Sequence, residues 1–220
     1  MPNGEVIIDC PKIILCEGSG DAAFLRHLIE VRHLPRFYLT YPTHHDPGKP
    51  GGRGGFTERL KALKLIRGFE KVTDVLVVSD NDDSPTRRFQ EVVELIEGAP
   101  GYSAPRAPRV PAGAGPRVTI FMLPTDNTPG QLETLCLESC LSHWPEMARC
   151  LNAFIACNAH LAEWDQGKQE KMKMRTMIAS ICSSDPNTSL THAWDRTEDI
   201  IPLEHECFND LSNFLQAFGA

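Results

Sequence analysis

Two stretches of similar pattern decide the fold of this chain: residues 13–21 read IILCEGSGD, and residues 75–83 read VLVVSDNDD. Each opens with a run of apolar side chains, which predicts a strand buried on both faces. Each run ends in acidic residues and is followed by the apolar spacing of a helix. Alternating strands and helices predict a parallel sheet. Both sets of acids are then expected at the carboxyl ends of its strands, where open α/β sheets keep their binding sites.

The remaining sequence continues this alternation and then becomes helical. Strands are predicted at residues 12–16, 37–41, 75–79 and 117–123. Helices are predicted at residues 21–33, at 56–69, from Pro85 onward, and after Pro129 and Gly130. Further helices are predicted at residues 145–163, 167–181 and 206–217. We therefore predict an α/β domain over residues 1–143, with a mostly parallel four-stranded sheet and helices on both faces, and a helical C-terminal extension, residues 144–220, packed on it.

Two segments rich in glycine and proline interrupt the pattern, at residues 42–55 and 98–116. They contain few large apolar side chains, so little burial is available to offset the entropy of ordering them. We expect these two loops to be the least ordered parts of the chain.

The composition is that of a globular protein, with 41% hydrophobic residues among 220. No apolar run approaches the roughly 20 residues of a membrane-spanning helix. The first residues lack the basic start and apolar stretch of a signal peptide. We therefore expect a cytoplasmic protein without membrane contact.

The eight cysteines do not follow a zinc or disulfide pattern, because no C-x-x-C pair is present. Cys16, Cys136, Cys140 and Cys182 lie in apolar segments, which indicates buried free thiols. Cys136 and Cys140 share a helix face and His143 follows, but a structural zinc site needs a fourth ligand that the local sequence does not offer.

The net charge of −7 speaks against a bare, high-affinity nucleic-acid surface, because lysine and arginine drive most such binding. It leaves a nuclease open, since metal ions would cover some of the acids and local basic patches can guide the substrate.

The acids themselves suggest a metal site. Carboxylate oxygens gathered at one sheet edge suit Mg²⁺ or Mn²⁺. Simpler roles exist for each acid: Glu17 and Asp21 can act as charges near a helix start, and Asp80 and Asp82 can cap the helix that follows them. Four polar residues in a row after a buried strand favour the metal site.

The same residues carry a family resemblance. Residues 16–21, CEGSGD, resemble the first Toprim motif, and residues 79–82, SDND, resemble its Asp-x-Asp motif. Residues 129–138, PGQLETLCLE, and the ending from residue 200 look similar to small stand-alone, OLD-like Toprim proteins of uncharacterised function. The resemblance implies a Toprim-like, Rossmann-like sheet. The chain carries no Walker motif, so an OLD-type activity would need an ATPase partner in trans or do without it.

The resemblance also implies roles for individual residues. Glu17 would be the catalytic acid/base or a metal-site residue, and Asp80 and Asp82 would be metal ligands. Asp21 and Glu133 or Glu138 would be ligands of a second metal. Glu133 and Glu138 lie about 500° apart on a helix, so one of them is expected to face the site, with Glu133 favoured. For substrate binding, the backbone of Gly18, Ser19 and Gly20 at a helix start can cradle phosphate, and Arg87 and Arg88 can contact it.

Two functions follow from these residues. The first is a Mg²⁺- or Mn²⁺-dependent nuclease acting on DNA or RNA. The alternative is a non-catalytic Toprim-like binding or regulatory subunit of a mobile-element or phage-defence complex. Primase-like nucleotide transfer is weaker, because no template-binding part is recognisable. The oligomeric state stays open.

Overall fold

A computed structural model of the protein describes residues 7–43, 52–196 and 198–219. Most of the predicted loop at residues 42–55 therefore lies outside the described residues. Within the described ranges, no helix combines the length and the apolar character needed to cross a bilayer. All eight cysteines are free, and the four expected to be buried are buried, which confirms the interpretation of their spacing.

The sheet contains four parallel strands in the order β2-β1-β3-β4. Their bounds are Lys12–Leu15 for β1, Tyr38–Thr40 for β2, Asp74–Asp80 for β3 and Arg117–Leu123 for β4. The central strand β3 is buried along almost its whole length, as the apolar run predicts. The α/β class, the parallel sheet and the adjacency of β1 and β3 are confirmed.

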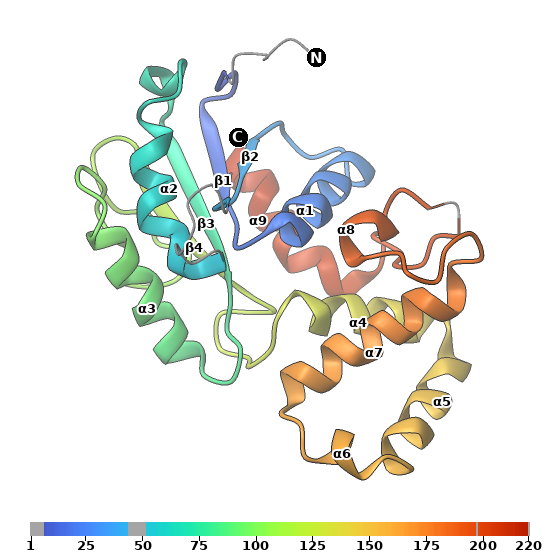
Figure 1. Ribbon diagram of the computed structural model, residues 1–220. Helices are drawn as coiled ribbons and strands as arrows, with labels where there is room; N and C mark the ends of the chain where they lie inside the picture. The colour runs from blue at the N-terminus through green and yellow to red at the C-terminus, as the bar shows by residue number, and fades with distance from the viewer. Residues whose placement is uncertain (1–6, 44–51, 197, 220) are drawn as a thin grey trace.

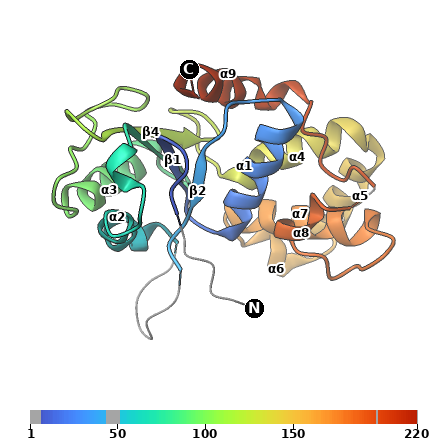
Figure 2. The ribbon, with the colours of Figure 1, turned by 90° about the horizontal axis from the view of Figure 1, so that it is seen from above.

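Helices cover both faces of this sheet (Figures 1 and 2). Helices α2, Phe56–Leu63, and α3, Pro85–Glu97, pack on one face. The other face is covered by α1, α4 and α9, with bounds Ser19–Val31, Leu132–His143 and Asn209–Gly219. Alternate strand residues supply the two cores: Val75 and Val77 face α2 and α3, whereas Leu76 and Val78 face the other layer. The period of two along each strand thus divides the apolar side chains between the two layers.

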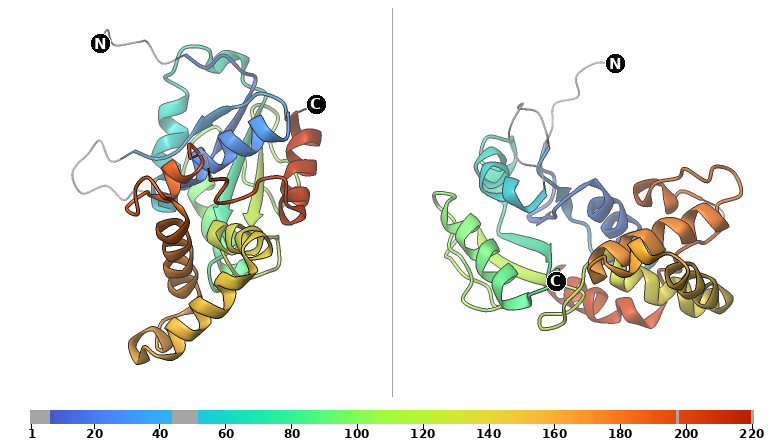
Figure 3. Two further views of the ribbon diagram at one scale, coloured as in Figure 1. Left: turned by 90° about the vertical axis from the view of Figure 1, so that its right-hand side faces the viewer. Right: turned by 60° about the horizontal axis from the view of Figure 1, so that its bottom comes forward.

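The C-terminal helices extend beyond the sheet (Figure 3). They are α5, Pro145–Ala156; α6, Ala159–Ala162; α7, Gln166–Ile181; and α8, Leu190–Ala193. Leu151, Met174 and Ile178 from these helices join the same apolar cluster as α1 and α4. The cluster is continuous across residue 143, and the domain boundary proposed there stays a prediction.

Two predicted helices end earlier than expected. The helix predicted at 145–163 is interrupted at Asn158, whose side chain accepts a hydrogen bond from the N–H of His160 (3.2 Å) and begins α6. The helix predicted at 56–69 ends at Leu63, and Gly68 then adopts a φ of 96°. A β-carbon at Gly68 would lie 2.1 Å from the carbonyl oxygen of Ile8, so glycine is required for this close approach.

The loop at residues 98–116 has no helix or long strand, and few of its residues are buried, namely Ala99, Tyr102 and Pro105; its expected lack of order stays a prediction. Tyr102 is 8% exposed, and its hydroxyl donates to the carbonyl of Leu60 at 3.0 Å. Ala112 forms an antiparallel bridge with Val118 of β4. One buried aromatic ring and these backbone bonds tie the segment to the α2–α3 side of the sheet.

Candidate functional site at the carboxyl edge of the sheet

The strand ends bring the first two acids together as predicted. Leu15 of β1 pairs with Val77 of β3, so Glu17, two residues further on, stands level with the end of β3. One carboxylate oxygen of Glu17, Oε1, accepts hydrogen bonds from the backbone N–H of Asp80 at 3.0 Å and from the hydroxyl of Ser79 at 2.5 Å. These bonds fix Glu17 across the edge of the sheet.

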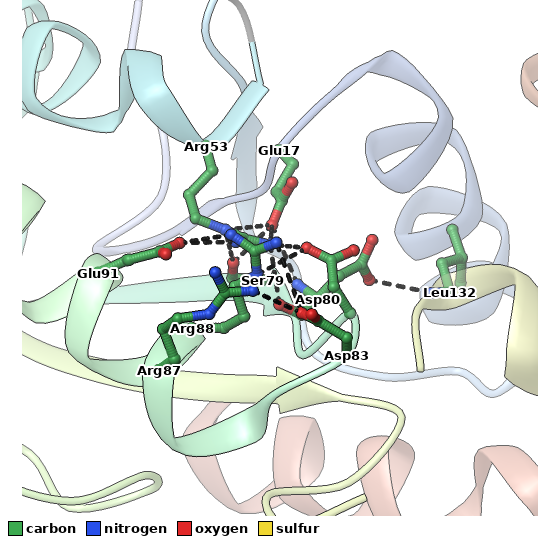
Figure 4. Close-up of polar contacts among 10 residues, drawn as sticks. Glu17, Arg53, Ser79, Asp80, Asp83, Arg87, Arg88, Glu91 and Leu132 are labelled. Carbon is green, nitrogen blue, oxygen red and sulfur yellow. Dashed lines mark hydrogen bonds and ion pairs between the residues drawn. The ribbon is translucent and has the colours of Figure 1, made fainter. Parts of the chain in front are cut away.

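An arginine that the sequence analysis did not select lies at the centre of the acids (Figure 4). Arg53 belongs to a short 3-10 turn, Gly52–Gly55, and its side chain is only 11% exposed. Its guanidinium lies 2.8 Å from Glu17, 3.1 Å from Asp82 and 3.3 Å from Glu91, and it also donates to Ser79. Burial alone would lower the pKa of Arg53, but the neighbouring carboxylates Glu17 and Asp82 raise it.

Asp82 lies on the arginine side of the site. Its φ of 47° is in the left-handed region, and its carbonyl accepts the N–H of Gly130 at 2.7 Å. Its carboxylate contacts Arg53 and Arg88, each at 3.1 Å. The backbone conformation therefore directs this acid toward two cations. Its predicted role as a metal ligand stays a prediction.

Three other acids, Asp21, Asp80 and Glu133, form a second half of the site, which we call the acid half. Asp80 accepts the N–H of Leu132 (3.0 Å) at the start of α4. Burial, followed by repulsion from Glu17, raises the pKa of Asp21 to about 7. The pKa of Asp80 is raised well above its ordinary value by burial and by the surrounding carboxylates. Burial also raises the pKa of Glu133, which Lys171 and Arg175 partly oppose.

A hard divalent cation fits the chemistry of the acid half. The ligand atoms would be carboxylate oxygens, and within the described residues no cation forms a hydrogen bond or salt bridge with the carboxylates of Asp21, Asp80 or Glu133, although Arg53 donates to the backbone carbonyl of Asp80 at 2.9 Å. In the described parts of the chain, these carboxylates do not form a group of three with oxygens all within 4.8 Å of one another. Side-chain rotation would therefore accompany binding of a shared ion.

The predicted phosphate-contacting residues differ in where they lie. The N–H of Gly18 is used by Asp21 at 2.8 Å, so this part of the predicted cradle is closed by a capping bond. Ser19 is exposed, and Gly20 faces a neighbouring hollow. Arg87 forms an exposed pair with Asp83 at 2.7 Å and does not contact the site acids.

Arg88, in contrast, borders the site. Its side chain contacts Asp82 and, at 2.8 Å, Glu91, which also binds Arg53. Arg88 is therefore placed to meet an anion that approaches the arginine side, whereas Arg87 is not.

Of the two glutamates on α4, Glu138 points away from the acid half and Glu133 points toward it. The carboxylate of Glu138 groups with His205 and Cys207, and the ligand atoms of these three residues lie within 4.8 Å of one another. Glu133, five positions earlier, acts on the pKa of Asp21 and Asp80. The periodicity of the helix separates the two glutamates as expected.

The raised pKa of Asp21 gives a testable pH dependence. In chelator, the folded protein keeps a proton on Asp21 between about pH 4 and pH 7, which the unfolded chain releases. This contribution to stability is complete below about pH 4 and is lost as the pH rises through about 7. Asp21→Asn keeps the acceptor for Gly18 and should remove this loss. We expect the variant to melt roughly 8–16 °C above wild type at pH 7.5 and within about 4 °C of it at pH 4.5.

The matched control is Asp83→Asn, because Asp83 is exposed and Arg87 lowers its pKa. The measurement is the melting temperature of wild type, Asp21→Asn and Asp83→Asn across this pH range in EDTA. Parallel curves for wild type and Asp21→Asn would show that Asp21 ionises normally.

Comparison with protein families matches nearly the whole chain to one of unknown function. Residues 11–219 match the family DUF3226, described as protein of unknown function. No curated protein and no solved structure matches the chain. Because the match spans nearly all of its residues, the chain belongs to the DUF3226 family.

Proposed function

We propose that this protein is a Mg²⁺- or Mn²⁺-dependent phosphodiesterase of the Toprim-like kind that hydrolyses nucleic acid in the cytoplasm. The observation that carries the proposal is the acid half of the site. Asp21, Asp80 and Glu133 converge where a parallel sheet presents its strand ends, and burial raises the pKa of each. Clustered carboxylates with raised pKa values are typical of functional sites, because their mutual repulsion does not stabilise the fold.

Asp80, Asp21 and Glu133 would hold the metal, with Asp82 available if Arg53 withdraws. A bound divalent ion supplies positive charge to a phosphate in the transition state and lowers the pKa of water. Glu17 has one oxygen held by Ser79 and Asp80. Its other oxygen, Oε2, has no hydrogen bond within the described residues and can accept a proton from an attacking water.

Arg53 and Arg88 complete the chemistry on the opposite side. Both guanidinium groups border the acids, and the fork of N–H donors on an arginine matches the geometry of a phosphate. A substrate phosphate would compete with Glu91 and Asp82 for these donors. The arginine side thus orients the phosphodiester, while the acid half carries the metal.

The alternative function, a non-catalytic binding or regulatory subunit, is favoured by Arg53. This one side chain contacts Glu17 and Asp82, two of the acids expected to serve the metal chemistry. An internal cation in that place neutralises acids that a catalytic ion would otherwise neutralise. In this role the protein would act with a partner, for example an ATPase supplied in trans.

Glu133 and Glu138 give a matched pair for the test. We expect wild type to nick plasmid DNA or cleave RNA with Mg²⁺ or Mn²⁺ and to be inactive in EDTA. Glu133→Gln should lower the rate by about 100-fold or more, because it removes a metal-binding charge. Glu138→Gln, on another face of the same helix, should retain the wild-type rate. If wild type cleaves neither DNA nor RNA with either metal, the nuclease proposal is wrong and the binding-subunit alternative stands.

A further inference from the structure

A hollow of about 890 Å³ lies beside the carboxylate site, between α7 and the segment that leads into α8. Gly20 and Glu133 belong to its lining, so the hollow opens onto the acid half of the site. Helix α7 contacts both α4 and α8, and Figure 1 shows it passing across this part of the molecule. The volume is in the range of about 300–1,000 Å³ that is typical of sites for organic ligands.

Cationic side chains of α7 line this hollow. Lys171 and Arg175 are four residues apart on one face of the helix, and Lys168 lies one turn earlier. Among the described residues, neither Lys171 nor Arg175 has a hydrogen bond or a salt bridge, and like charges at this spacing repel. Lys168 pairs with Asp165 at 3.1 Å, an exposed contact that stabilises little. Lys171 and Arg175 act electrostatically on Glu133, which among the described residues is the single acid in the lining. Three cations against one acid leave the hollow positive in a protein of net charge −7, which indicates an anionic ligand.

A tryptophan in the same lining adds an apolar surface. Trp164 is 42% exposed and lies just before α7. The side-chain amide of Gln169 donates to the backbone carbonyl of Trp164 at 3.1 Å, which fixes the backbone that carries the ring. An exposed aromatic ring beside cations is the arrangement with which proteins hold unpaired nucleic-acid strands. Inside a duplex the faces of paired bases are covered by their neighbours, so only the two end pairs offer this ring a face to stack on.

We infer that this hollow binds the unpaired end of a nucleic-acid strand and leads it into the carboxylate site. Trp164 stacks on a base, Lys171 and Arg175 contact phosphates, and the strand passes Gly20 and Glu133 on its way to the acids. The inference rests on the proposed function and adds to it the substrate class, a single strand rather than a duplex.

A second hollow lies along the first turns of α7 and shares part of its lining with the first. It measures about 590 Å³, and its lining includes Asp82 and Arg88 from the arginine side. Lys168 and Lys171 line both hollows. The same two lysines therefore connect the hollow beside Trp164 with the arginine side of the site.

The charge of the hollow is tested by equilibrium binding in EDTA, where no metal-dependent cleavage occurs. The probes are fluorescent oligo-dT and oligo-U of about 12 nucleotides, and the same dT strand in a duplex. The double variant Lys171→Gln, Arg175→Gln should weaken single-strand binding by about 10-fold or more and reduce the salt slope by about 1.4. Lys173→Gln, on the same helix but outside the lining, is the control and should bind as wild type does.

The stacking contact is tested with Trp164→Ala, which should weaken single-strand binding roughly 5- to 150-fold, and Trp164→Tyr, which should restore most of it. Phe154→Ala is the control, because Phe154 is 47% exposed on α5 and outside the lining. Equal losses for Trp164→Ala and Phe154→Ala, duplex binding as tight as single-strand binding, or no binding of either strand would overturn the inference.

The binding assay and the cleavage assay test the inference and the proposed function independently. Strand binding that depends on Trp164 in EDTA, in a protein that never cleaves with Mg²⁺ or Mn²⁺, would keep the inference and remove the nuclease. Cleavage that is unchanged by Trp164→Ala and by the double variant would keep the nuclease and remove the inference.

Discussion

Replacing Asp80 with asparagine is expected to lower metal-dependent cleavage by about 1,000-fold or more, because a metal ion at such a site stabilises the transition state by several kcal/mol. The same variant should be more stable than wild type in EDTA. Burial and the surrounding carboxylates raise the pKa of Asp80 well above its ordinary value, so an uncharged side chain relieves repulsion there. Asparagine still offers an oxygen to the N–H of Leu132, so the start of α4 is preserved.

Melting temperatures with and without Mg²⁺ or Mn²⁺ separate the two functions. The wild type should gain stability from the ion by mass action, and Asp80→Asn should gain much less. Asp83→Asn is the control, since Asp83 is exposed and paired with Arg87, and it should shift as wild type does. Equal metal-induced shifts in wild type and Asp80→Asn would remove Asp80 from the site. A clear shift in wild type without cleavage of any nucleic acid would favour the binding subunit.

The sheet edge could be predicted because its signal is local. Uninterrupted apolar runs such as residues 13–16 and 75–78 indicate strands buried on both faces, and parallel strands place their carboxyl ends together. The acids that follow them, Glu17 and Asp80, therefore meet in the structure. The separation of Glu133 from Glu138 followed from helix geometry in the same way.

The partners of these acids could not be predicted, because they come from distant segments without periodicity. Arg53 lies in a run of glycines, where nothing in the local pattern indicates which way a long side chain points. Asp82 turns toward Arg53 because of a left-handed backbone conformation, which the residue type does not require. Tyr102 is similar: one aromatic residue in a proline-rich loop anchors a segment whose composition indicates little burial.

The second large effect is expected at Arg53. Arg53→Met keeps an unbranched apolar stem but removes the charge that Glu17, Asp82 and Glu91 share. Breaking a buried ion pair from one side costs about 3–5 kcal/mol, which corresponds to a loss of roughly 6–20 °C in melting temperature for a chain of this size. Arg87→Met is the control, because its exposed pair with Asp83 should contribute about 2 °C or less.

The response of Arg53→Met to metal then shows whether the arginine and a divalent ion use the same acids. Without the guanidinium, Glu17 loses its cation and Asp82 keeps only Arg88, so Mn²⁺ should raise the melting temperature of the variant by more than it raises that of wild type. A shift in the variant with none in wild type would mean that Arg53 holds the place of the ion, as the regulatory alternative requires. Equal shifts would mean that the ion binds only in the acid half, around Asp21, Asp80 and Glu133. A variant as stable as wild type would contradict the role of Arg53 as the counterion of the site, because three acids cannot lose their shared cation in a buried position without a measurable cost.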